Sequence, residues 1–155
     1  MMAEITDVVE FSMGRELYAM DIQIAREIVE MVTITPVPRA PAYIAGIINL
    51  RGELTNILNL RELLGLPAGE ASVEAQKIIV LMADMVGGSN LGIIVDDVRS
   101  VVQISEKDVE RMSDGLSTDI NDFVKGIIKM KETGSDKKGL VIWLDMIRVI
   151  ENLMK

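Results

Sequence analysis

Two apolar runs in segment 43–61 flank the turn Arg51-Gly52-Glu53, and a helix-like stretch, 61–64, follows the second run. Apolar runs on either side of a short glycine-containing turn are typical of a β-hairpin. The segment therefore predicts a hairpin that leads directly into a helix. This pattern restricts the fold more than any other part of the chain does.

The pattern occurs a second time downstream. Segment 123–131 repeats the layout of the first strand and 140–147 repeats the second, with a longer turn between them. Another matched pair lies upstream of each hairpin, in which 18–22 and 26–30 correspond to 91–95 and 99–103. A repeat of about 75 to 80 residues is too long for a solenoid unit, so it predicts two similar β subdomains packed together.

The rest of the chain predicts further strands and short helices. Residues 8–13 and 16–20 predict another hairpin, and Asp21 is a candidate cap for one helical turn through Ala25. A capping box over 105–108 predicts a short helix. The other predicted elements are strands over 27–34, 77–85 and 91–95, a connector over 66–76, a surface loop over 112–121, and a helix over 144–154 with Asp145 as its cap.

Composition and charge limit the possible environments and partners. A chain of 155 residues, 49% of them hydrophobic, can bury a substantial core. The net charge of -8 and the scattered basic residues argue against a nucleic-acid partner. The sequence has no run of eighteen apolar residues and no signal peptide at its N-terminus, so we expect a cytoplasmic protein that does not insert into a membrane.

The absence of histidine and cysteine excludes most common catalytic sites. A chain without either residue has no imidazole base, no phosphoacceptor histidine, no thiolate nucleophile and no Cys- or His-ligated metal. Carboxylate pairs remain, but the sugar-binding clefts that use them also need aromatic platforms, and only 3% of the residues are aromatic. We therefore expect no enzymatic activity, cofactor or metal, and a carboxylate-dependent enzyme is the least favoured function.

Three acidic residues allow a competing interpretation. Asp96 and Asp97 end an apolar run, which resembles the acidic pair of a response-regulator receiver domain, and Asp145 resembles the phosphoacceptor aspartate. A receiver domain needs further helices and strands after that aspartate, whereas only ten residues follow Asp145. We therefore favour a role in starting a turn for Asp96 and Asp97, and a helix cap for Asp145.

The motif Gly46-Ile-Ile-Asn-Leu-Arg-Gly52, followed by Asn59-Leu-Arg61, resembles the hallmark of the CheW-like chemotaxis coupling proteins. The resemblance covers about 8–152 and implies a single CheW-like domain, with approximate halves 8–66 and 77–152. It departs from the usual pattern at Ala25, where valine is usual, and at Asn59, where aspartate is usual. The fold that it implies is mostly β, with two five-stranded SH3-like barrels and short helices, one of them at the C-terminus.

The resemblance also implies a function and partners. CheW-like proteins are non-enzymatic adaptors that bind the cytoplasmic tip of methyl-accepting chemoreceptors and the regulatory domain of the histidine kinase CheA. A protein of this kind acts in the cytoplasm and is recruited to membrane-associated receptor arrays. The alternative is a CheW-like module of another chemosensory kinase pathway, for example one that controls pilus-based motility.

Six residues form the expected site and its supporting turns. Glu27, Val29, Arg51 and Val98 are the candidate receptor-binding residues, because a coiled-coil tip needs aliphatic contacts beside fixed polar groups. We expect them to line a groove between the barrels, with the kinase bound at a different surface formed by apolar hairpin ends. Glu27 is also a candidate partner of Arg51 within the fold. Gly52 is expected to supply a positive φ, and Gly46 a close backbone approach.

Overall fold

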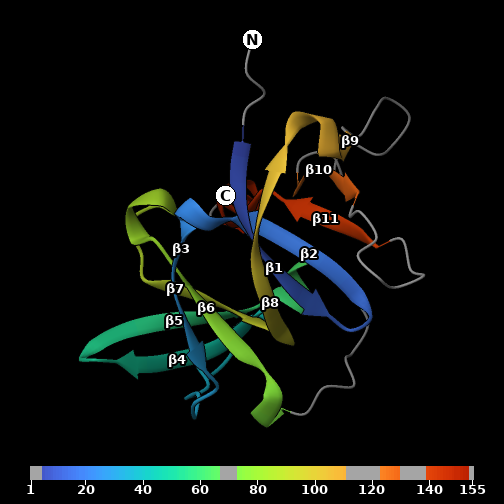
Figure 1. The fold of residues 1–155 in the computed structure, drawn as a ribbon. Helices are drawn as coiled ribbons and strands as arrows, with labels where there is room; N and C mark the ends of the chain where they lie inside the picture. The colour runs from blue at the N-terminus through green and yellow to red at the C-terminus, as the bar shows by residue number, and fades with distance from the viewer. Residues whose placement is uncertain (1–4, 67–72, 111–122, 130–138, 154–155) are drawn as a thin grey trace. The chain divides into compact units, whose positions relative to one another are not determined.

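The computed structural model describes residues 5–66, 73–110, 123–129 and 139–153. Within these residues the chain forms eleven strands and two short α-helices (Figure 1). The strands are β1 (Ile5–Met13), β2 (Glu16–Asp21), β3 (Ala25–Glu30), β4 (Ile44–Leu50), β5 (Glu53–Asn59), β6 (Lys77–Leu81), β7 (Leu91–Val95), β8 (Asp97–Ser105), β9 (Val109–Glu110), β10 (Val124–Lys129) and β11 (Leu140–Leu144). The helices are α1 (Leu60–Leu63) and α3 (Met146–Leu153).

The strands form two sheets with the same internal order. One sheet has the order β8-β1-β2-β11-β10-β9, and the other has the order β3-β6-β7-β5-β4. In each sheet two antiparallel hairpins meet through one parallel pair, β2 with β11 and β5 with β7. The duplication predicted from the sequence is therefore present in the sheet topology. One sheet has six strands rather than five because the two-residue strand β9 pairs with β10.

The chain divides into two compact units that differ from the sequential halves expected from the repeat. Unit 1 comprises Met1–Ile22 and Arg99–Lys155, and unit 2 comprises Gln23–Val98. The reason is that β3 follows β2 along the chain but pairs with β6, whereas β8 follows β7 but lies beside β1. The strand that follows each upstream hairpin therefore belongs to the other unit: β3 to unit 2 and β8 largely to unit 1. A linear repeat in the sequence does not reveal this exchange.

Several local predictions are confirmed, and two strands are shorter than expected. A 3₁₀ turn at Ile22–Ile24 follows Asp21, and the Ser105 capping box starts another at Glu106–Asp108. Strand β3 ends at Glu30 rather than at residue 34, and β6 ends at Leu81 because a 3₁₀ turn follows. The predicted loop 112–121, most of the turn of the second hairpin and most of the connector 66–76 lie outside the described residues.

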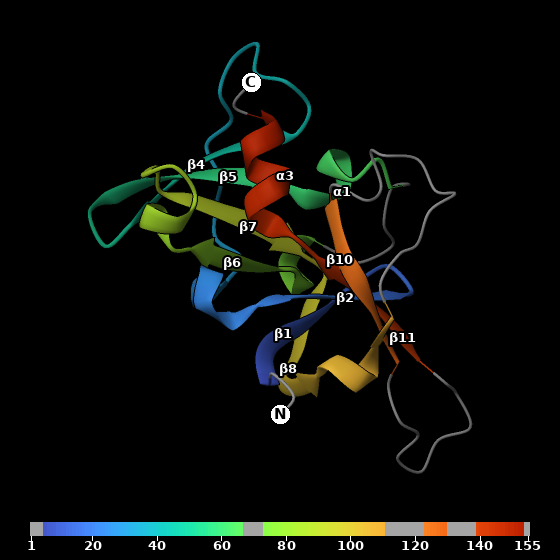
Figure 2. The same cartoon turned by 90° about the horizontal axis from the view of Figure 1, so that it is seen from above.

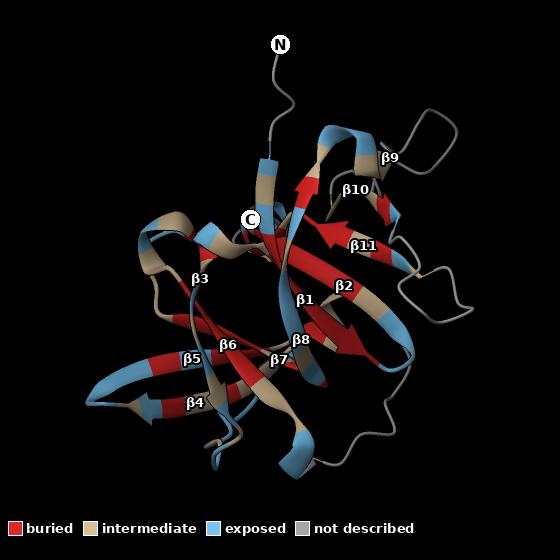
Figure 3. Cartoon of the chain, in the orientation of Figure 1, coloured by how far each residue is buried: buried red, intermediate tan, exposed pale blue. Residues whose placement is uncertain are grey.

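Each unit has its own apolar core, built from the inward-facing residues of its strands (Figure 3). Alternate residues of a strand point to opposite faces. Exposed and buried residues alternate in the middle of β5, whereas consecutive residues of β1 and β6 are buried, so both faces of those strands are covered. Burying one such aliphatic side chain stabilises a fold by about 1.5 to 3 kcal/mol. The central residues are Ile48, Ile57, Ile78 and Val80 in unit 2, and Val8, Ala19, Ile104, Ile128, Val141 and Trp143 in unit 1.

Both downstream hairpins lead into a helix, as the sequence predicted. Strand β5 continues into α1 and β11 continues into α3, as Figure 2 shows for the second copy. The side chain of Asp145 accepts a hydrogen bond from the N–H of Arg148 at 3.1 Å, which confirms the predicted cap of α3. The core of unit 2 and the β4–β5 hairpin together support the candidate site.

Candidate functional site

The turn between β4 and β5 contains only Arg51 and Gly52, because Leu50 pairs directly with Glu53. Both turn residues have positive φ, +50° at Arg51 and +87° at Gly52, as in a type I′ hairpin turn. The N–H of Gly52 donates a hydrogen bond of 2.8 Å to the side-chain oxygen of Asn49. Left-handed backbone at a residue with a side chain costs about 1 to 2 kcal/mol, so the hairpin holds Arg51 in a conformation that it would otherwise avoid.

Arg51 contacts Glu27 across the sheet of unit 2. One terminal nitrogen of its guanidinium donates a short hydrogen bond to the carboxylate of Glu27 on β3. The side chain of Arg51 is 61% exposed and that of Glu27 is 24% exposed. The hydrogen bond and the positive charge of Arg51 hold the pKa of Glu27 below its ordinary value of 4.5, and the same contact raises the pKa of Arg51. Both groups are therefore charged at neutral pH.

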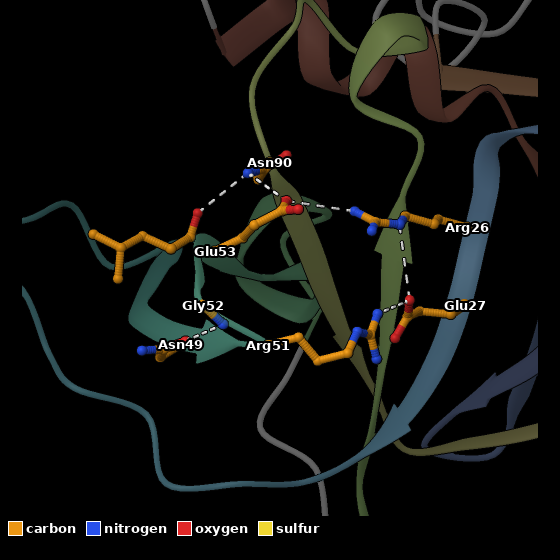
Figure 4. A network of polar contacts seen from close by, with 8 residues as sticks. Arg26, Glu27, Asn49, Arg51, Gly52, Glu53 and Asn90 are labelled. Carbon is orange, nitrogen blue, oxygen red and sulfur yellow. Dashed lines mark hydrogen bonds and ion pairs between the residues drawn. The ribbon is translucent and has the colours of Figure 1, made fainter.

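Three further side chains extend this contact into a charged cluster, shown in Figure 4. Arg26 lies between two carboxylates, with its Nε 3.8 Å from an oxygen of Glu27 and an Nη 3.7 Å from an oxygen of Glu53. The side-chain amide of Asn90 donates to Glu53 at 3.3 Å. Two arginines and two glutamates make the cluster neutral overall. Exposed ion pairs contribute about 0 to 1 kcal/mol each to stability, so the cluster adds little to the free energy of folding.

Glu27 and Arg51, two of the four candidate receptor-binding residues, are in direct contact. Val29 lies two residues further along β3, half-buried against the apolar core of unit 2. Val98 is half-buried near the start of β8, where its N–H donates to the side chain of Asp97. The structure thus brings together Glu27 and Arg51, places Val29 on the same strand as Glu27, and does not join Val98 to the charged cluster.

Gly46 has a packing role that explains its place in the motif. Its φ is +147°, and a Cβ atom there would overlap the carbonyl oxygen of Thr35 and approach Cγ2 of Ile34 to 2.7 Å. Thr35 forms an isolated β-bridge with Ile47, with N–H to O distances of 2.8 and 3.0 Å. Only glycine allows the chain before β4 to approach the hairpin this closely.

Sequence reasoning missed Asn49, Arg26 and Asn90. An asparagine three residues before a turn glycine is a signal for a side-chain to backbone hydrogen bond, so Asn49 could have been found. Arg26 and Asn90 gave no such signal, because both contact Glu53, which is distant in the sequence. Only the folded sheet brings these residues together.

The acidic residues that suggested a receiver domain have structural partners. Asp96 is 7% exposed and accepts hydrogen bonds from Arg61 at 2.9 Å and from Gln76 at 3.2 Å. Asp145 caps α3. The chain bends at Asp96, between β7 and β8, as expected, and Asp96 also forms a buried ion pair there. The expectation is wrong for Asp97, which begins β8.

The described residues contain neither a metal-binding cluster nor a membrane-spanning helix. Among them, no group of three or more Asp, Glu, His or Cys side chains is arranged to hold a metal ion. No helix in the same part of the chain has both the length and the apolar character needed to cross a membrane.

Comparison with known proteins gives a consistent result. The model of the CheW-like domain family matches residues 7–154. The chain is 34% identical to a chemotaxis protein CheW of Treponema pallidum, covering 79% of this chain and 72% of the relative. It is 28% identical to a chemotaxis protein CheW of Thermotoga maritima, covering 95% and 89% of the two chains.

A solved structure extends the likeness to three dimensions. The crystal structure of the scaffolding protein TtCheW from Thermoanaerobacter tengcongensis is similar to this chain, with a TM-score of 0.73 and 33% sequence identity. The match covers 92% of this chain and 90% of that one. It confirms the expected fold class of two SH3-like β units with short helices. The chain belongs to the CheW-like family of chemotaxis adaptor proteins.

Proposed function

We propose that this chain joins the cytoplasmic tips of methyl-accepting chemoreceptors to the regulatory domain of the histidine kinase CheA. It does so as a non-enzymatic adaptor that needs no cofactor, in the cytoplasm, where it is recruited to membrane-associated receptor arrays. The family match over 7–154 and the scaffolding protein of similar fold support this function. The receptor-binding surface includes Glu27, Val29, Arg51 and Val98.

The observation that carries the receptor site is the exposed, fixed guanidinium of Arg51. A guanidinium has five N–H donors, and among the described residues Arg51 donates only to Glu27. The side chain is 61% exposed, so its remaining donors are available to a carboxylate or to the backbone carbonyls of a helix. Val29 supplies apolar surface two residues from Glu27. A helical receptor tip with an apolar seam and flanking charges has the matching chemistry.

Reversing the charge of Arg51 tests this site. The variant Arg51→Glu places a third carboxylate beside Glu27 and Glu53, so it repels an acidic group on the receptor and removes the donors. Titration calorimetry with a soluble receptor cytoplasmic fragment should show binding weakened by about 1 to 3 kcal/mol. Binding to the CheA regulatory domain and the melting temperature should change little.

Lys129→Glu provides the matched control for charge reversal. Lys129 is an exposed end residue of β10 in the corresponding hairpin of unit 1 and pairs with Glu110 at 3.2 Å. The same change of charge at this position should leave receptor binding unaltered. If Arg51→Glu instead unfolds the protein, or weakens receptor and kinase binding equally, Arg51 is a structural residue and the site assignment is wrong.

A further inference from the structure

Strand β3 has an irregularity at the position where it meets the charged cluster. Its pairing with β6 shifts between Ala25 and Glu27, so Arg26 is an extra residue in the ladder. Neighbouring side chains of a regular strand point to opposite faces, whereas a bulge changes where the next side chain points. Figure 4 shows the side chains of Arg26 and Glu27 both directed toward the β4–β5 turn.

We propose that Arg26 is a positioning residue of the receptor-binding site, which holds Glu27 and Glu53 in place around Arg51. The inference rests on the proposed function and adds a residue to it. Arg26 and Arg51 carry the same charge, so Arg26 acts on Arg51 through the carboxylates of Glu27 and Glu53. The bulge in β3 is the backbone feature that makes this arrangement possible.

The contacts of Arg26 explain how it acts on Glu27. The carboxylate of Glu27 accepts a hydrogen bond from Arg51 and has the Nε of Arg26 at 3.8 Å. A carboxylate between two guanidinium groups keeps one orientation, because each positive charge restricts the rotation that would break the other contact. Without Arg26, Glu27 can rotate away and the Arg51 side chain loses its fixed partner.

Arg26 also acts on Glu53, the residue that follows the turn. An Nη of Arg26 lies 3.7 Å from the Glu53 carboxylate, and Asn90 donates to the same oxygen at 3.3 Å. The negative charge of Glu53 is close enough to help raise the pKa of Arg51. If Arg26 is removed, Glu53 keeps its contact with Asn90 but loses a positive charge, so its carboxylate can turn toward Arg51 and occupy the donors that the receptor needs.

A double-mutant cycle with a soluble receptor cytoplasmic fragment tests the inference. Arg26→Gln should weaken binding about two- to fivefold, as expected for the loss of exposed ion pairs. In the Arg51→Ala background the same substitution should have no effect, because the guanidinium that Glu27 and Glu53 hold in place is then absent. Lys77→Gln is the control, since it removes a separate, partly exposed ion pair, with Glu30, that joins β3 to β6. It should leave the affinity unchanged.

A second readout requires no partner. Arg51 and then Arg26 hold the pKa of Glu27 low, so Arg26→Gln should raise this pKa in an NMR titration of the side-chain carboxyl carbon. The melting temperature should change little, because exposed pairs contribute little to stability.

The outcomes separate the inference from the proposed function. If the unsubstituted chain does not bind the receptor fragment, both fail. If it binds and Arg26→Gln has no effect, or weakens binding equally with and without Arg51, the positioning role alone is wrong. Weakened binding that disappears in the Arg51→Ala background supports it.

Discussion

The two hairpin-to-helix segments, β4–β5–α1 and β10–β11–α3, have the same backbone framework. In the first, the N–H of Asn59 donates to the carbonyl oxygen of Tyr43 at 2.7 Å; in the second, the N–H of Asp145 donates to that of Phe123 at 2.8 Å. The side chains of Asn59 and Asp145 then cap the following helices. Both first strands also shift register at the same place, between Ile44 and Gly46 and between Val124 and Gly126.

The two segments differ in their turns and in the lengths of their helices. The first hairpin closes in two residues and presents Arg51 beside Glu27, whereas the last described pair of the second is Lys129 with Leu140. Helix α1 has four residues and α3 has eight. The shared features are backbone hydrogen bonds, caps and bulges that any copy of the fold needs. Among the residues that the structure describes, the cluster of two arginines and two exposed or half-buried glutamates belongs to the first copy, which makes that copy the better candidate for binding.

Strands β7 and β2 occupy corresponding positions in the two sheets, and each has an aspartate near its end with different hydrogen-bond partners. In unit 2, Asp96 follows β7 and forms a buried ion pair with Arg61. In unit 1, Asp21 ends β2 and accepts hydrogen bonds from Trp143 Nε1 at 2.7 Å and from Lys125 at 2.9 Å. The Lys125 amine also lies 4.8 Å from the centre of the Trp143 ring. The same strand thus carries different polar chemistry in each copy.

Of the substitutions considered, the one at Gly46 in the first hairpin should lower the free energy of unfolding most. Gly46→Ala forces a Cβ against the backbone of Thr35 at a φ that alanine disfavours, so the free energy of unfolding should fall by at least about 3 kcal/mol in urea denaturation. Gly52→Ala is the control, because its φ is also positive but no atom lies near its Cβ. It should cost about 1 kcal/mol. Equal losses would show that the close approach at Gly46 is not the cause.

Removing each carboxylate near these strand ends compares the two units directly. Asp96→Ala should lower the free energy of unfolding by about 2 to 3 kcal/mol, because Arg61, whose side chain is only 12% exposed, loses an opposite charge. Asp21→Ala should cost about 2 kcal/mol: the buried indole N–H of Trp143 loses its acceptor, but the charged partner Lys125 is 31% exposed and can turn to water. Chemical denaturation of both variants measures the difference. A larger loss for Asp21→Ala would reverse this ranking.

Removing the helix caps tests whether the shared framework has the same strength in both copies. Asp145→Ala should cost about 1 kcal/mol, because its bond to the N–H of Arg148 is 3.1 Å long and begins an eight-residue helix. Asn59→Ala should cost about 0.5 kcal/mol, because its 3.4 Å bond is weaker and α1 is a single turn. Thermal unfolding of the two variants gives the comparison, and equal shifts would contradict it.

The smallest expected effects concern two glutamates whose pKa values are shifted in opposite directions. Burial in β1 raises the pKa of Glu10 above 4.5, although the charge of Arg99 opposes this, whereas Arg51 lowers the pKa of Glu27. A raised pKa means that the folded state binds the proton more tightly, so Glu10 lowers stability as the pH rises through 4.5. Glu27 does the opposite: it stabilises the fold above 4.5, and this contribution is lost as the pH falls through its lowered pKa.

Unfolding measured between about pH 3 and pH 7 checks both signs. At neutral pH, Glu10→Gln should raise the free energy of unfolding slightly and Glu27→Gln should lower it slightly. Both differences should shrink toward the acidic end, where the two glutamates are protonated. A Glu10→Gln variant that is less stable at pH 7 would mean that the charge of Arg99 outweighs burial.

The sequence determined the parts of this fold that depend on neighbours in the chain. The Arg51-Gly52 turn, the Asp145 cap and the Ser105 capping box all follow from local backbone preferences and hydrogen bonds, which a few adjacent residues decide. Apolar runs on either side of a short turn predicted the hairpins, and their recurrence predicted two similar subdomains. The motif around Arg51 also indicated the family, which comparison with known proteins then confirmed.

Tertiary structure decided what depends on residues far apart. The assignment of β3 and β8 to their units follows from which sheet edge each strand meets, and a linear repeat does not specify that pairing. The charged cluster needs Arg26 and Glu27 from β3 opposite Arg51 from the β4–β5 turn, and the bulge in β3 sets the direction of their side chains. The ion pair between Arg61 and Asp96 likewise joins residues 35 positions apart. Contacts of this kind form only when the sheet is complete, because strand pairing, not chain proximity, brings the charges together.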